Sequence, residues 1–194
     1  MGNESKINYE NGVKNKAKNN FTEAIKDFSN AIIYNNEYVE AYNQRALCYL
    51  AESKYDLSII DCNKAIDLTS NNNLKALLFE VRSRSYIEKK DYVNAITDLN
   101  KSCEITFTAA FDKRGNLHYK LGNYYEALLD FNQMSVMFPS DGNYKFKMGI
   151  CYYRIGDLEN ALENVENSME MGYDKGTLIL EEIKTEILLK KLGK

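Results

Sequence analysis

Apolar and small residues recur along this chain at the 3.6-residue spacing of an α-helix, in pairs of segments joined by short polar turns. The clearest pair spans residues 111–139. Its first segment places Gly115 in an apolar stripe and ends at Gly122, a residue suited to the left-handed backbone that terminates a helix. Its second segment carries Ala127 in a similar stripe and ends at Pro139. The pattern predicts two antiparallel helices that approach closely where Gly115 faces Ala127.

This helical pair occurs five times along the chain, and each copy has a small residue at the same position of its second helix. The five markers are Ala24, Ser58, Ala95, Ala127 and Ala161. They lie 34, 37, 32 and 34 residues apart. Such a period predicts a stack of hairpins, because each hairpin buries its apolar face only against its neighbours. We therefore expect a single domain over residues 1–194, with repeats at about 5–38, 39–72, 76–107, 108–141 and 142–175.

Some repeat ends depart from the pattern. The polar residues 69–73 are interpreted as a loop that lengthens the second interval, and Phe107 stands where the next copy has Pro139. The first repeat begins weakly, because Asn8 and Asn11 occupy positions where large apolar residues are favoured. We expect this edge of the stack to fray or to be completed by another element.

A final helix is predicted at 176–192. Its apolar positions are Ile179, Leu180, Ile183, Ile187, Leu188 and Leu192. A stack of repeats needs a terminal element that covers the last hairpin, so we interpret this helix as a cap. Leu178 and Leu189 leave its outer side less polar than a cap requires. A dimerisation helix therefore stays open as the alternative.

The hairpin at 111–139 resembles the tetratricopeptide repeat, a 34-residue helix-turn-helix with aromatic, glycine, alanine and proline residues at set intervals. Its signature sites are matched or conservatively replaced, except that His118 stands where tyrosine is usual and Met134 where alanine is usual. The resemblance implies an all-α fold, a right-handed superhelical solenoid of five such hairpins plus a C-terminal capping helix. It also implies that the first helices line a concave groove.

Composition and charge exclude several classes of protein. The chain is 44% hydrophobic and 27% charged, and no segment approaches the roughly 18 consecutive apolar residues of a membrane span. No signal peptide is visible at the start. The net charge of −3 argues against nucleic-acid binding, which needs a basic face. We expect a cytoplasmic protein with no membrane and no nucleic-acid partner.

The cysteines and the histidine give little indication of catalysis or metal binding. Cys48, Cys62, Cys103 and Cys151 show no C-x-x-C pairing and no zinc spacing, which favours reduced, buried thiols over metal ligands or disulfides. The single histidine, His118, occupies a packing site, and no serine or cysteine nucleophile can be given a second histidine. No phosphate-binding glycine loop or metal-spaced carboxylate cluster is present. We expect no enzyme activity, no catalytic residue, no metal and no cofactor.

A binding groove is predicted on the side of the first helices opposite their packing stripes. The candidate groove residues are Asn43, Gln44, Leu47, Leu50, Leu77, Val81, Arg84, Ile87, Lys113, Asn116, Tyr119, Lys120, Phe146, Lys147, Ile150, Tyr153 and Arg154. The middle of this set is apolar, and its C-terminal end pairs aromatic residues with lysine and arginine. It predicts a protein or peptide partner with a hydrophobic anchor and acidic neighbours. The alternative is that the apolar members pack between neighbouring repeats.

These observations favour a non-enzymatic scaffold or adaptor that binds a segment of another protein in the groove. A self-assembling structural subunit, a homo-oligomer through the first repeat and the last helix, is the alternative. A chaperone co-factor is less favoured, because the family's two-carboxylate clamp needs lysine, asparagine and arginine at set positions. Those positions hold Tyr9, Val13, Gln44, Leu77 and Val81.

Overall fold

The computed structural model describes residues 2–106 and 110–193, and all regular structure there is helical. The all-α fold is therefore confirmed. The predicted boundary between the third and fourth repeats at 107/108, with Phe107, lies outside the described residues. The chain divides into two compact units, one within Met1–Thr108 and one within Ala109–Lys194. Whether the five hairpins act as one domain stays a prediction.

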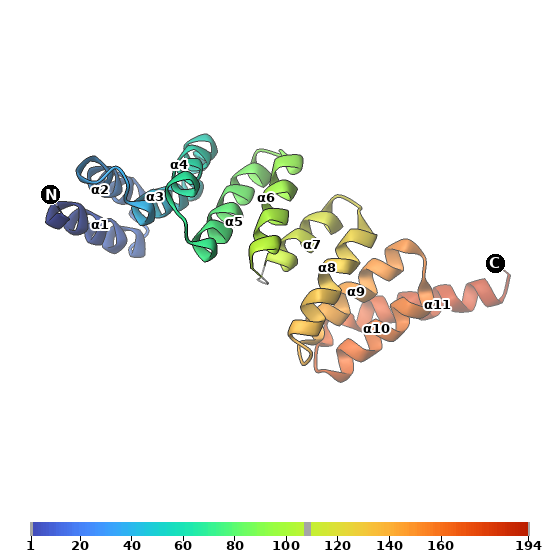
Figure 1. Cartoon of the computed structure of the whole chain (residues 1–194). Coiled ribbons are helices and arrows are strands. Elements are labelled where there is room, and N and C mark those ends of the chain that lie inside the picture. The colour runs from blue at the N-terminus through green and yellow to red at the C-terminus, as the bar shows by residue number, and fades with distance from the viewer. Residues whose placement is uncertain (1, 107–109, 194) are drawn as a thin grey trace. The chain divides into compact units, whose positions relative to one another are not determined.

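Each unit is a row of antiparallel helices that follow one another along the chain (Figure 1). The first unit contains α1 (Gly2–Ala17), α2 (Phe21–Tyr34), α3 (Val39–Ala51), α4 (Tyr55–Leu68), α5 (Asn72–Glu88) and α6 (Tyr92–Ile105). The second contains α7 (Ala110–Lys120), α8 (Tyr124–Met137), α9 (Gly142–Ile155), α10 (Leu158–Glu170), a short 3₁₀ helix η1 (Asp174–Gly176) and α11 (Thr177–Lys191). The helices pair as successive hairpins, with α1 and α5 beginning before the predicted repeat starts at 5 and 76.

Every hairpin turns through a residue with positive φ at the same place in its repeat. These residues are Asn19, Ser53, Lys90, Gly122 and Gly156. The left-handed geometry lets the chain reverse directly after the first helix. Aspartates then start several helices, as where the side chains of Asp91 and Asp157 accept hydrogen bonds from backbone N–H groups at the beginning of α6 and α10.

Glycines on the first helices, Gly12, Gly115 and Gly149, allow the close crossing inside three hairpins. A Cβ atom at Gly115 would lie 2.8 Å from Phe131 Cε1, and one at Gly149 would lie 2.6 Å from Val165 Cγ2. Phe131 and Asp130 are the α8 residues that face Gly115, and Ala127 of α8 is fully buried. Any side chain at Gly115 or Gly149 would therefore push the two helices of its hairpin apart.

The 37-residue interval between Ser58 and Ala95 owes its length to a longer helix rather than to a longer loop. The sequence predicted a polar loop over 69–73 and a repeat that starts at 76, but α5 begins at Asn72. Asn71 explains the difference, because its side chain accepts a hydrogen bond from the backbone N–H of Leu74 and caps the helix. The additional residues extend α5 at its N-terminal end.

Three consecutive hairpins share a buried ion pair that joins their two helices. The pairs are Arg45–Asp61, Arg82–Asp98 and Arg114–Asp130, each 16 residues apart. In all three, the guanidinium nitrogens contact both carboxylate oxygens, and the carboxylate side chains are 3–4% exposed. Burial lowers the pKa of Arg45, but its hydrogen bonds and charge interaction with Asp61 outweigh that effect and raise it. Burial raises the pKa of Asp61 in turn, yet the two-point contact favours the ionised pair.

The last helix packs on the final hairpin with one face. Leu180 and Ile183 of α11 are buried against Ala161 and Val165 of α10. Leu188 and Leu192 were expected to widen this apolar face, and that expectation is wrong, since they are 57% and 61% exposed. Leu188 lies in the last turn of α11 and Leu192 directly follows the helix, and both leave an apolar surface there.

Candidate functional site

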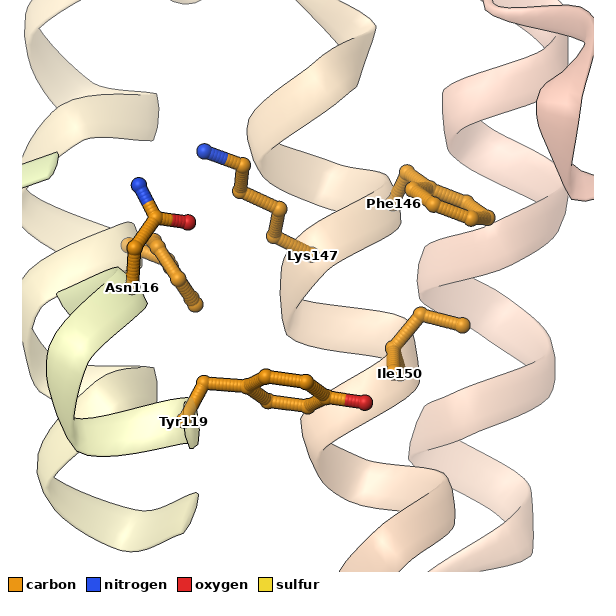
Figure 2. A pocket seen from close by; sticks show the side chains of 6 residues that line it. Asn116, Tyr119, Phe146, Lys147 and Ile150 are labelled. Atoms are coloured by element: carbon orange, nitrogen blue, oxygen red, sulfur yellow. The ribbon is translucent and has the colours of Figure 1, made fainter. Parts of the chain in front are cut away.

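A pocket of about 320 Å³ opens between α7, α8 and α9 of the second unit (Figure 2). It is lined by Asn116 and Tyr119 from α7, Phe131 from α8, and Phe146, Lys147 and Ile150 from α9. Five of these six were candidate groove residues. Tyr119 reaches from α7 toward Ile150, while Lys147 extends toward Asn116 (Figure 2). The pocket therefore has aromatic and aliphatic walls with a polar rim.

The polar rim is held together by one carboxylate. Lys147 Nζ lies 2.6 Å from Asp112 Oδ1, and Asn116 Nδ2 donates a hydrogen bond to the other oxygen of Asp112 at 3.0 Å. The ammonium group also lies 5.1 Å from the ring centre of Phe131. The sequence predicted Lys147 as a cation for an acidic partner, but its charge is already balanced inside the protein.

The candidate residues Tyr153 and Arg154 continue the site along α9. A hydrogen bond with the Tyr119 side chain raises the pKa of Arg154 and ties it to α7. The pKa of Tyr153 is raised as well, first by loss of solvent and then by the negative charges of Glu186 and Glu182 on α11. Arg154 is exposed and Tyr153 is half-buried.

The remaining two candidates of this unit, Lys113 and Lys120, belong to α7. Lys113 is half-buried and Lys120 is exposed. Neither lines the pocket between α7, α8 and α9. Their place in the candidate site therefore rests on the sequence pattern.

In the first unit, the candidate residues form a shallower site. Leu50, Arg84 and Ile87 line a hollow of about 280 Å³ together with Tyr55 and Glu88. Arg84 is exposed, and within residues 2–106 and 110–193 no ion-pair partner approaches it. This hollow has a larger polar share than the pocket of the second unit, so it is less suited to an apolar anchor.

The other candidates of the first unit divide between surface and interior. Leu77 is 44% exposed, whereas Leu47 is half-buried and Gln44 accepts a hydrogen bond from Lys16 at 2.7 Å. Val81 and Asn43 were predicted to line the groove, and that prediction is wrong for both, since they are 3% and 5% exposed. Val81 packs against Ala46 and Cys62, because α5 lies directly on the preceding hairpin.

Sequence reasoning missed two sets of residues. Phe131 was assigned to packing alone, and although it is only 1% exposed it also belongs to the lining of the pocket between α7, α8 and α9. The three Arg–Asp pairs were overlooked, although an arginine followed 16 residues later by an aspartate occurs in three consecutive repeats. A search for arginine and aspartate 16 residues apart, recurring from repeat to repeat, would have found them.

The rest of the described chain carries no cluster of metal-binding side chains. No group of three or more His, Cys, Asp or Glu side chains in residues 2–106 and 110–193 could hold a metal ion. All four cysteines are buried, and Cys48, Cys62 and Cys151 are free thiols. In the same residues, none of the helices combines the length and the apolar character needed to cross a bilayer.

Comparisons with known proteins agree with this architecture. The sperm-associated antigen 1 of Homo sapiens is 33% identical over 82 residues, which covers 42% of this chain and 8% of that protein. The Hsp70-Hsp90 organizing protein of Triticum aestivum is 23% identical over 79% of this chain and 33% of its own length. The chain thus spans about a third or less of the length of these curated relatives.

A solved structure shows the same fold over nearly the whole chain. YrrB, described as a TPR protein with an unusual peptide-binding site, superposes with a TM-score of 0.72 at 17% identity and covers 90% of both chains. The family model for the tetratricopeptide repeat matches residues 16–73 and 113–168, more than half of the chain. The hairpins, their left-handed turns and this match together show that the chain belongs to the tetratricopeptide repeat family.

Proposed function

We propose that this protein is a non-enzymatic adaptor that binds a segment of another protein on the inner surface of its first helices. The observation that carries the proposal is the pocket between α7, α8 and α9, with the aromatic rings of Tyr119, Phe131 and Phe146 and the side chain of Ile150. A pocket of about 320 Å³ has room for a large apolar side chain, and such pockets anchor peptides by removing that side chain from water. Proteins of this repeat family typically mediate protein–protein interactions.

The defining feature of the proposed partner is a hydrophobic anchor. Acidic neighbours in the partner have weaker support, because Asp112 balances Lys147 and Tyr119 engages Arg154. A chaperone co-factor that grips two carboxylates also has weak support. One of the two lysine positions of that clamp holds the exposed Leu77, and the arginine position holds the buried Val81.

One observation favours the second candidate function, a self-assembling subunit. Helix α11 exposes Leu178 by 81% and Leu188 by 57%, and Leu192 directly after the helix is 61% exposed. Apolar residues in such a row could pair with another copy of the chain. Sedimentation equilibrium at several concentrations tests this candidate, and a strict monomer eliminates it.

The cytoplasm is the compartment we propose for the adaptor. Cys48, Cys62 and Cys151 are fully buried and unpaired, and burial raises the pKa of Cys62 and Cys151 to about 12. Thiols of this kind stay protonated and suit a reducing environment.

Affinity capture with mass spectrometry tests the adaptor function. Ile150→Asp places a charge in the apolar wall, so proteins captured by the wild type should be lost. Val93→Asp is the matched control, because Val93 is 77% exposed on α6 and lines no described pocket. Circular dichroism should show that both variants are folded. Equal capture by the wild type and Ile150→Asp would refute the proposed site.

A further inference from the structure

The inner side of α9 borders two neighbouring hollows in the second unit. The first is the pocket with Phe146, Lys147 and Ile150, described above. The second, of about 450 Å³, lies between Tyr153 of α9 and five residues of α11, which are Glu181, Glu182, Thr185, Glu186 and Leu189. Ile150 and Tyr153 are three residues apart, which places them on the same face of the helix. The two hollows are therefore close enough for one bound segment to reach both.

The two hollows differ in charge. Asp112 neutralises Lys147 in the first, so its apolar walls carry no net charge. In the second, Glu186 lies 4.0 Å from Lys190, whereas Glu181 and Glu182 have no ion-pair partner in the part of the chain that the structure describes. Both carboxylates are exposed toward the hollow. With three carboxylates in its lining against Lys190 and the neighbouring Arg154, the second hollow keeps an excess of negative charge beside the apolar pocket.

We propose that the segment bound by this protein carries a large apolar residue for the first hollow and a lysine or arginine for the second. The inference rests on the adaptor function proposed above and adds the chemistry of the partner. The ring of Tyr153 offers a surface for the aliphatic stem of the basic residue, and Glu181 and Glu182 accept hydrogen bonds from its charged end. The sequence pattern alone predicted acidic neighbours, so the sign of the partner's charge is reversed.

The geometry also sets the spacing between the two residues. Both hollows border the same face of α9, the first toward α7 and α8 and the second toward α11. They therefore lie one helix-to-helix distance of about 9 Å apart and are displaced by about 7 Å along the helix axis. These components give a separation of roughly 12 Å, which an extended peptide covers in about three to four residues at 3.3 Å per residue. The basic residue should therefore stand three or four positions from the apolar anchor.

A phage-displayed library of random 12-residue peptides, selected on the full chain, tests the inference. Enriched peptides should share a large apolar residue and a lysine or arginine at the predicted spacing. Binding of a labelled enriched peptide, measured by fluorescence anisotropy, should weaken about 3- to 10-fold in the double variant Glu181→Gln and Glu182→Gln, because each exposed charge pair contributes modestly. Replacing the peptide's basic residue with glutamine should weaken binding equally.

A matched control removes two negative charges elsewhere. Glu159 and Glu163 are exposed on α10 and line neither hollow, so Glu159→Gln with Glu163→Gln should leave affinity unchanged. Peptides that need Ile150 but show no basic preference would overturn this inference and leave the adaptor function standing. Equal effects of the two double variants would do the same. If no peptide is enriched on the wild type over Ile150→Asp, both proposals fall.

Discussion

Removing the carboxylate from one of the buried Arg–Asp pairs should destabilise the fold strongly. In the pair of α5 and α6, Arg82 Nε lies 2.7 Å from Asp98 Oδ2 and Nη2 lies 2.6 Å from Oδ1. The side chains are 15% and 3% exposed, and the guanidinium also lies 5.4 Å from the ring centre of Phe79. In Asp98→Ala, the charge of Arg82 stays in this enclosed place without its partner.

The expected loss follows from the burial of the pair. Breaking a buried ion pair by removing one member costs about 3–5 kcal/mol, whereas exposed pairs contribute about 1 kcal/mol or less. Because Arg82 retains some contact with solvent and a hydrogen bond to Asn63, we place Asp98→Ala near the lower end, at about 3 kcal/mol. Urea unfolding followed by circular dichroism at 222 nm measures this loss as a lower midpoint.

Two further variants separate the charge effect from packing. Arg82→Met combined with Asp98→Leu should recover most of the stability, because apolar side chains can replace a buried pair at little cost. Glu23→Ala breaks the exposed pair with Lys26, whose side chains are 61% and 72% exposed, and should leave the midpoint unchanged. If Asp98→Ala behaves like Glu23→Ala, the pairs do not hold the hairpins together.

Three other outcomes are expected. Gly115→Leu should cost on the order of 1–3 kcal/mol through overpacking against Phe131, and a thermal melt without loss would contradict the crossing. Ile183→Ala on α11 should cost about 2–5 kcal/mol in urea unfolding, while Leu178→Ala, 81% exposed, should be neutral; equal effects would contradict the packing of this helix. Burial lowers the pKa of His118 below its unfolded value of about 6.5. The free energy of unfolding should therefore be level above about pH 6.5 and fall below that pH, where only the unfolded state binds the proton. It should level off again below the depressed pKa, where both states bind the proton. His118→Gln should remove this fall in a pH series of urea midpoints, and an unchanged pH profile would exclude His118 as its source.

The hairpins could be predicted because their determinants are local. Small residues such as Gly115 and Ala127 sit at a fixed period, and the turn glycines Gly122 and Gly156 end the first helices where the pattern stops. The exceptions depend on single side chains. Asn71, for example, starts α5 earlier than the period indicates by capping it.

The site was harder to predict, because its charges are set by contacts between repeats. Asp112 and Lys147 are 35 residues apart, and their ion pair arises only when α7 and α9 lie side by side. Val81 faces inward for a similar reason, since α5 covers the hairpin before it. A helical projection shows which face a residue occupies, but it does not show what the next repeat places against that face.

The central claim is that a partner segment occupies the pocket between α7, α8 and α9. Site-specific photocrosslinking tests it most directly, with a benzophenone amino acid in place of Ile150 in one variant and in place of Val93 in another. The account predicts discrete crosslinked partner bands from position 150 and none from position 93. No crosslink at position 150, or the same bands from both positions, would contradict it.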